Sequence, residues 1–136
     1  MAPESDRNLE VARRYVALVA NPATAFEDLN ELLDQRLVWR EMPNRFAPAG
    51  RTNDRAGAEA SWRKGRDAVH DQRYIISSAV ASGDTVALEI AWHGTVTKPL
   101  GPFAAGTTLS AELAMFLRFE NGRIVSQTDY LCYHPT

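Results

Sequence analysis

Apolar residues return every three or four positions in two stretches of the chain, and this is the spacing of amphipathic helices. In the first stretch, Ser5–Ala20, the inward positions are Leu9, Ala12, Val16 and Val19. In the second stretch, about Asp54–Asp71, they are Ala58, Trp62, Gly65 and Val69. We therefore predict one helix in each stretch.

A further helix is predicted between these two. Asn21-Pro22 ends the first helix, and Thr24-Ala25-Phe26-Glu27 has the pattern of a capping box, which satisfies the free backbone N–H groups of a helix start. The apolar positions that follow would face inward: Phe26, Leu29, Leu32 and Leu33. The first two helices along the chain should then pack as a hairpin.

The rest of the chain alternates as extended strands do. A short strand is predicted over Leu37–Met42, and Pro43 stops it before a loop that runs through Gly50. Beyond Gln72 the predicted strands are Tyr74–Ala81, Thr85–Thr97, Thr108–Glu120 and Arg123–Tyr133. The last two are joined by Asn121-Gly122, the strongest short hairpin signal.

Helices followed by several strands predict a segregated α+β fold. Three helices on a curved, mostly antiparallel sheet would form a cone, and this layout leaves an internal apolar pocket between sheet and helices. The length of 136 residues suits a single domain over residues 1–136.

Composition narrows the classes of function. The 15 Lys and Arg against 17 Asp and Glu give a net charge of -2 with interleaved signs, so we expect no nucleic-acid partner and no membrane partner. No apolar run is long enough to span a bilayer, and we expect a soluble, cytoplasmic protein. The sequence has no glycine-rich phosphate loop, and its histidines share no ligand spacing, so we predict neither cofactor nor metal.

Alternation also predicts which side chains face the pocket. The inward positions of the two long middle strands are Val86, Leu88, Ile90, Trp92, Leu113, Met115, Leu117 and Phe119. On the last strand the same face carries Gln127, Asp129 and Leu131, while Cys132 faces away and is predicted to be a small packed hydrophobe. Trp39 and Glu41 take the inward positions of the first strand.

Asp129 is anomalous on so apolar a face. A carboxylate that loses hydration must find hydrogen-bond donors or shift its pKa upward. If Glu41 enters the same pocket, the two acids titrate as a coupled pair, as a general acid and base require. Alternatively, both are ordinary buried acids with partners such as Arg45, Arg66 or Tyr15.

The sequence resembles the nuclear transport factor two-like superfamily, in its SnoaL-like and ketosteroid-isomerase-like branch. The stretches that carry the resemblance span nearly the whole chain: Arg14–Val19, Leu37–Pro43, Gly83–Glu89, Leu117–Ile124 and Asp129-Tyr130. The resemblance implies the cone-shaped fold. The superfamily includes isomerases, polyketide cyclases, dehydratases, epoxide hydrolases and members without catalysis, so the fold alone does not set the activity.

The resemblance also implies residue roles. Tyr15 falls where ketosteroid isomerases carry the tyrosine that donates to the substrate oxyanion, and Glu41 falls at or one residue from their general-base aspartate. Met115 replaces their second oxyanion donor, so a steroid isomerase is not expected.

Limonene-epoxide hydrolases give a second comparison. Asp129 matches their water-activating aspartate, and Trp39 and Glu41 align with the tyrosine and asparagine that help hold the water. Ile90 and Trp92 replace their arginine and second aspartate.

The leading hypothesis is cofactor-independent acid–base chemistry, of the cyclase, isomerase, dehydratase or hydrolase type, on a small, mostly apolar oxygenated molecule. Glu41 would remove or accept a proton, Asp129 would deliver one or orient water, and Tyr15 would stabilise negative charge on oxygen. The residues expected to bind the substrate are Trp39, Arg45, Trp62, Ile90, Trp92, Met115 and Gln127.

Two other hypotheses remain open. The same pocket could bind an apolar metabolite without catalysis. Alternatively, the cavity is filled by side chains and the protein acts through a homodimer. That homodimer is expected to form through the opposite sheet face, which carries Ala87, Glu89, Ala91, His93, Phe116 and Tyr130.

Overall fold

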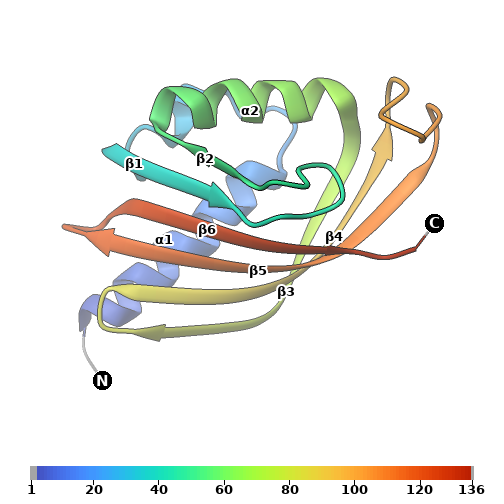
Figure 1. Cartoon of the computed structure of the whole chain (residues 1–136). Helices are drawn as coiled ribbons and strands as arrows, with labels where there is room; N and C mark the ends of the chain where they lie inside the picture. Colours follow the sequence, from blue (N-terminus) through green and yellow to red (C-terminus); the bar gives the residue numbers. More distant parts are fainter. Residues whose placement is uncertain (1–2, 136) are drawn as a thin grey trace.

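The chain folds into two α-helices and one curved six-stranded sheet (Figure 1). The computed structural model describes residues 3–135. In chain order its elements are α1 (Pro3–Ala20), the 3-10 helix η1 (Phe26–Leu29), β1 (Leu33–Glu41), β2 (Arg51–Asn53), α2 (Arg55–Ala68), β3 (Val69–Ser82), β4 (Thr85–Val96), β5 (Thr108–Glu120) and β6 (Arg123–Tyr133). The predicted α+β class is confirmed.

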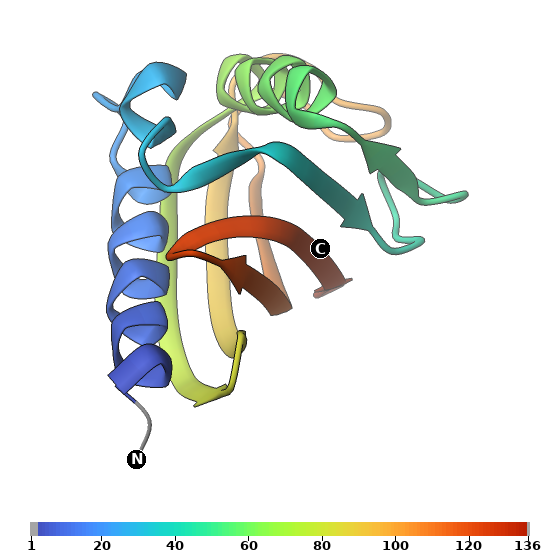
Figure 2. The same ribbon diagram turned by 90° about the vertical axis from the view of Figure 1, so that its left-hand side faces the viewer.

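The strands lie in the order β2-β1-β6-β5-β4-β3. β1 and β6 run parallel, whereas the other neighbouring strands are antiparallel. Figure 2 shows α1 standing beside β3 and β4 and α2 lying above β1, in agreement with the contacts between these elements. No helix in the described part of the chain is long and apolar enough to cross a membrane.

The predicted helix after Thr24 is wrong in extent, so the fold has two α-helices and not three. Only one 3-10 turn forms, and Leu33 already belongs to β1, where it pairs with Ile124. The four apolar positions are buried as expected, but the carbonyl of Leu32 accepts a hydrogen bond of 2.8 Å from the N–H of Ile124. A run of four apolar positions fits a helix and a buried strand equally, and pairing with β6 decides the outcome.

The helix predicted over Asp54–Asp71 is confirmed as α2 but ends earlier. Asp54 caps it by accepting a 2.8 Å hydrogen bond from the N–H of Gly57. Val69, which was expected on the helix face, instead begins β3 and pairs with Val96. The short strand β2 was not predicted, because three residues carry no readable alternation.

The predicted alternation of β4, β5 and β6 is confirmed. Leu88 lies opposite Met115, and Met115 lies opposite Asp129, so one face of three strands is continuous. β5 and β6 have the predicted bounds. Their turn places Asn121 and Gly122 at φ of 52° and 78°, the left-handed conformation that this residue pair accepts at low cost.

Replacement of Gly122 by Ala should therefore lower the free energy of unfolding by about 1–2 kcal/mol, because a Cβ is disfavoured at positive φ. Urea unfolding measures the loss. The matched control is Gly65→Ala in α2, where an added Cβ meets no atom within 4 Å and φ is ordinary. That change should instead stabilise the protein by about 0.5–1 kcal/mol. Equal effects of the two substitutions would contradict the assigned turn.

Candidate active site

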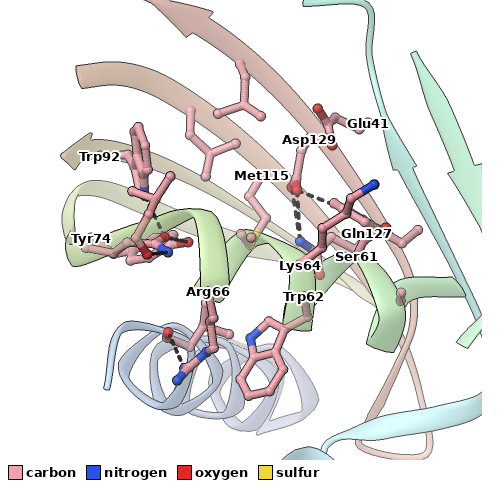
Figure 3. Close-up of a pocket in the computed structure, with 18 of the residues that line it drawn as sticks. Glu41, Ser61, Trp62, Lys64, Arg66, Tyr74, Trp92, Met115, Gln127 and Asp129 are labelled. Atoms are coloured by element: carbon pink, nitrogen blue, oxygen red, sulfur yellow. Dashed lines mark hydrogen bonds between the residues drawn. The ribbon is translucent and has the colours of Figure 1, made fainter. Parts of the chain in front are cut away.

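A pocket of about 470 Å³ lies between the sheet and the helices (Figure 3). Its walls are mostly apolar, and they come from both helices and from the inward face of the sheet. Such a volume lies in the range of small-molecule sites. One cluster of its polar side chains surrounds a single carboxylate.

Asp129 is that carboxylate, and its side chain is held by two donors. β6 places it on the inward face with only 6% of its surface exposed. The indole Nε1 of Trp39 donates to Oδ2 at 2.9 Å, and Nε2 of Gln127 donates to Oδ2 at 3.0 Å and to Oδ1 at 3.2 Å. Figure 3 shows Asp129 beside Gln127 on the pocket wall.

Burial raises the pKa of Asp129 from 3.8 to about 6. The hydrogen bonds from Trp39 and Gln127 favour the ionised form and oppose this shift, while the neighbouring Glu41 carboxylate adds to it. Desolvation is the largest effect. Asp129 therefore exchanges a proton close to neutral pH, as a general acid or base must.

Glu41 lies beside Asp129 at the end of β1. The parallel register pairs the two residues directly, and Glu41 is 8% exposed. Nδ2 of Asn44 donates to its Oε2 at 2.7 Å, and Nε of Arg51 lies 3.9 Å from its Oε1. The structure thus brings the two predicted acids together, with different partners for each.

Tyr15 reaches the same group from α1. Its buried hydroxyl donates to Oε1 of Gln127 at 2.5 Å. This bond fixes the orientation of the Gln127 amide, whose NH2 group then points to Asp129. Burial, with the Asp129 charge, raises the pKa of Tyr15 well above its ordinary value, so the hydroxyl keeps its proton. That single proton goes to Gln127 and is not presented to a substrate oxygen.

The other predicted binding residues divide into two groups. Five of them line the pocket: Trp39, Trp62, Trp92, Met115 and Gln127. Arg45 and Ile90 do not line it. Arg45 is exposed on the loop after β1, with its guanidinium 4.7 Å from the ring centre of Phe103, and Ile90 is packed in the core with 1% exposure. The loop of Arg45 and the strand of Ile90 do lie beside the pocket, as predicted. The predictions were wrong in placing these two side chains inside it.

Several pocket residues were not expected from the sequence. Tyr74 donates to Oε1 of Gln72 at 3.2 Å, and the indole of Trp92 donates to the same oxygen at 3.1 Å. Alternation along β3 was the signal that could have found Tyr74, whereas Arg51 belongs to the unpredicted β2. Asn44, on the loop after β1, donates to Glu41.

The remaining predictions about reactive groups concern cysteine and metals. Cys132 faces away from Asp129 as expected, but it is exposed and not packed, because the outward side of β6 near its end is uncovered. Within residues 3–135 no group of three His, Cys, Asp or Glu side chains is arranged to hold a metal ion. Arg66, considered as a partner of the acids, donates instead to the backbone carbonyls of Val19, Asn21 and Pro22.

Solved structures of nuclear transport factor two-like proteins superimpose on this chain, which therefore has that fold. Residues 12–127 match the model of the SnoaL-like domain, which is most of the chain, and the chain therefore belongs to the SnoaL-like family. The resemblance found in the sequence is confirmed. No curated protein matches the sequence.

Solved structures with this fold are distant in sequence. A proposed SnoaL-like polyketide cyclase from Jannaschia sp. CCS1 superimposes with a TM-score of 0.81 at 12% identity, covering 96% of this chain and 89% of its own. AclR, a proposed hydroxylase from Streptomyces galilaeus, superimposes with a TM-score of 0.77 at 20% identity, covering 93% of this chain and 79% of its own. IdmH, a proposed polyketide cyclase from Streptomyces antibioticus, superimposes with a TM-score of 0.73 at 22% identity, covering 96% of this chain and 92% of its own. At these identities the likeness shows the fold.

The raised pKa of Asp129 predicts a specific pH dependence of stability. Between about pH 4 and pH 6 the folded protein binds this proton more tightly than the unfolded chain does. The free energy of unfolding contributed by Asp129 should therefore fall as the pH rises through this window, by up to about 3 kcal/mol, and stay level above it.

Urea unfolding of the wild type and of Asp129→Asn from pH 4 to pH 7.5 measures this contribution as a difference. The free energy of unfolding of the wild type minus that of Asp129→Asn should decrease as the pH rises from about 4 to about 6. Asp67→Asn is the matched control, because Asp67 is exposed and pairs with Lys98 on the surface, and it should keep the wild-type dependence. A difference between wild type and Asp129→Asn that is constant with pH would refute the shift.

Proposed function

We propose that this protein catalyses cofactor-independent acid–base chemistry on a small, mostly apolar oxygenated molecule bound in the pocket. The observation that carries the proposal is one carboxylate, Asp129, buried in an apolar pocket with a pKa of about 6. A base at that pKa is ionised at neutral pH and still returns its proton readily. Family membership agrees, because structures with this fold include proposed polyketide cyclases.

The contacts favour Asp129 rather than Glu41 as the proton acceptor. Glu41 is bound by the Asn44 amide and lies near the cationic Arg51 guanidinium, whereas the partners of Asp129 are the neutral side chains of Trp39 and Gln127. The negative charge of Glu41 in turn raises the proton affinity of Asp129. Glu41 therefore acts as the second acid of the pair, and Tyr15 acts as a positioning residue through Gln127.

The reaction class is proton transfer at a carbon next to a carbonyl group. An oxygen of Asp129 takes the proton, the electron pair of the C–H bond passes into the carbonyl to form an enolate, and the same carboxylic acid returns the proton to the substrate. The aromatic walls, Trp39, Trp62 and Trp92, suit a flat ring beside this group. Isomerisation and ring closure both use such a step.

Deuterium exchange at the acidic carbon of small cyclic ketones and 1,3-diketones, followed by NMR in D2O, tests the proposal. The wild type should accelerate exchange of at least one ketone, with a rate that rises through about pH 6 as Asp129 ionises. Asp129→Asn should lose at least about a hundredfold of this rate, and Asp67→Asn should lose none. Exchange that is equal in Asp129→Asn, or absent for the whole panel, contradicts catalysis, and apolar ligand binding then becomes the favoured function.

We also propose that the outer sheet face forms a homodimer. Phe116 and Tyr130 are 44% and 46% exposed there and pack edge to face at 5.8 Å, and Ile75 on β3 is 52% exposed. An apolar face of this kind is typical of an interface core. This outer face is independent of the pocket, because alternation along each strand places its side chains on the side of the sheet opposite to the side chains that line the pocket.

Phe116→Glu should convert the dimer to a monomer in sedimentation equilibrium, since it places a charge at the centre of that face. Arg63→Glu on α2 changes an exposed residue elsewhere and should leave the mass unchanged. A wild-type protein that sediments as a monomer would contradict the proposed homodimer.

A further inference from the structure

The polar hydrogens that face the pocket are mostly already bound within the protein. The hydroxyl of Tyr15 donates to Gln127, and that of Tyr74 donates to Gln72. The indole of Trp39 donates to Asp129 and that of Trp92 to Gln72. An enolate formed in this pocket needs a donor at its oxygen, because negative charge in an apolar site is otherwise costly. None of these four groups is free to supply it.

Two further donors lie near the acids, Arg51 and Tyr133. The guanidinium of Arg51 is already used, because it pairs with Glu41 at 3.9 Å and donates to the carbonyl of Phe46 at 3.3 Å. Tyr133 remains. It is the last residue of β6, lines the pocket and is partly buried. Within residues 3–135 no side chain or backbone group bonds its hydroxyl, which is accessible to a ligand and not sealed in the core. Glu41 and Asp129 both act on its ionisation, and burial together with these charges raises the pKa of Tyr133 to about 12. The hydroxyl thus keeps its proton at neutral pH and remains a donor close to the acid pair.

The ring of Tyr133 is held in place. Phe46 packs against it edge to face with ring centres 4.8 Å apart, and Trp92 does so at 6.1 Å. The backbone just beyond it is also fixed, because the N–H of His134 donates to the carbonyl of Ser110 at 2.9 Å. A rigid donor without a partner is the arrangement that stabilises charge as it develops, since little reorganisation is needed.

Three other donors of the pocket are not used within the described part of the protein. Ser61 and Lys64 line the pocket from α2, but Lys64 is exposed and its charge is screened by water. The indole Nε1 of Trp62 is buried without a partner, and the guanidinium of Arg66 covers that ring at 4.0 Å. Tyr133 alone of these combines a fixed ring with proximity to both acids.

We propose that Tyr133 is a catalytic residue that donates its hydroxyl proton in a hydrogen bond to the substrate carbonyl oxygen, and that the substrates are ketones whose enolate oxygen lies between Tyr133 and Asp129. This inference rests on the proposed function, because it assigns the donor for that reaction. It implies that the substrate carries its acidic C–H toward Asp129 and its oxygen toward the end of β6. The role expected of Tyr15 thereby belongs to Tyr133.

Binding of naphthols of increasing acidity tests this proposal, because a bound naphtholate resembles an aromatic enolate. At pH 7.5 Tyr133→Phe should weaken binding of 2-naphthol by about tenfold or more, and the loss should grow as the naphthol becomes more acidic. Its urea unfolding midpoint should stay at the wild-type value, because the hydroxyl has no partner in the free protein.

Tyr15→Phe is the matched control, since it also removes one pocket hydroxyl. It should lower the unfolding midpoint, because it leaves Oε1 of Gln127 buried without a donor, and it should leave the dependence on naphthol acidity unchanged. Asp129→Asn should bind naphtholates more tightly, because a negative charge is removed beside the oxygen.

The possible failures are distinguishable. If Tyr133→Phe binds every naphthol as tightly as the wild type while Asp129→Asn alters both binding and deuterium exchange, the donor assignment is wrong and the proposed chemistry stands. If Asp129→Asn alters neither, the proposed chemistry is wrong. A wild-type protein that binds no naphthol overturns the donor assignment, and deuterium exchange then decides separately whether the proposed chemistry stands.

Discussion

The parallel pairing of β1 with β6 is the constraint on which the site depends. Trp39 and Asp129 are 90 residues apart along the chain, yet this pairing lets them share a hydrogen bond. In a parallel pair the chain must return from the C-terminal end of the first strand to the N-terminal end of the second, at the opposite end of the sheet. Here β2, α2, β3, β4 and β5 make that crossing. The site therefore exists only when the complete sheet has assembled.

The pairing of β1 with β6 includes an irregularity that orients the last residues of β1 toward the pocket. The register with β6 shifts between Leu33 and Val38, and in this segment Asp34 accepts a 2.8 Å hydrogen bond from the N–H of Arg36. A bulge turns the strand and re-aims the residues after it. Trp39 and Glu41 consequently face the pocket beside Asp129 and not the solvent.

Burial of Asp129 is a compromise between two opposing effects. A fully satisfied carboxylate would have a low pKa and would be a poor base, whereas an unsatisfied one would destabilise the fold. Trp39 and Gln127 supply enough hydrogen bonds to keep the group ionised near neutral pH, but desolvation and Glu41 still outweigh them. Gln127 does this only because Tyr15 fixes which end of its amide faces the acid.

Sequence reasoning worked where one face of a strand is buried, and it failed where partners are decided in three dimensions. Alternation placed Gln127 and Asp129 correctly, because a shift of one residue would have exposed the whole apolar set. It could not show that Leu33 would join a strand, because the competing helix and strand patterns share the same apolar positions. Nor could it show that Arg51 would lie near Glu41, since β2 is too short to have a pattern.

The direction of a hydrogen bond is equally invisible in a sequence, and it separates Tyr15 from Tyr133, two of the three tyrosines that line the pocket. Tyr15 matches a known donor position, but its proton is already used within the protein. Tyr133 matches none, and among the described residues nothing bonds its hydroxyl, which faces the pocket. Asp129, Leu131 and Tyr133 share one face of β6, with roughly 3.3 Å of rise per residue. A ketone whose acidic C–H meets Asp129 and whose oxygen meets Tyr133 must therefore lie with its carbonyl group directed along β6, and this fixes which face of the ketone the base can reach.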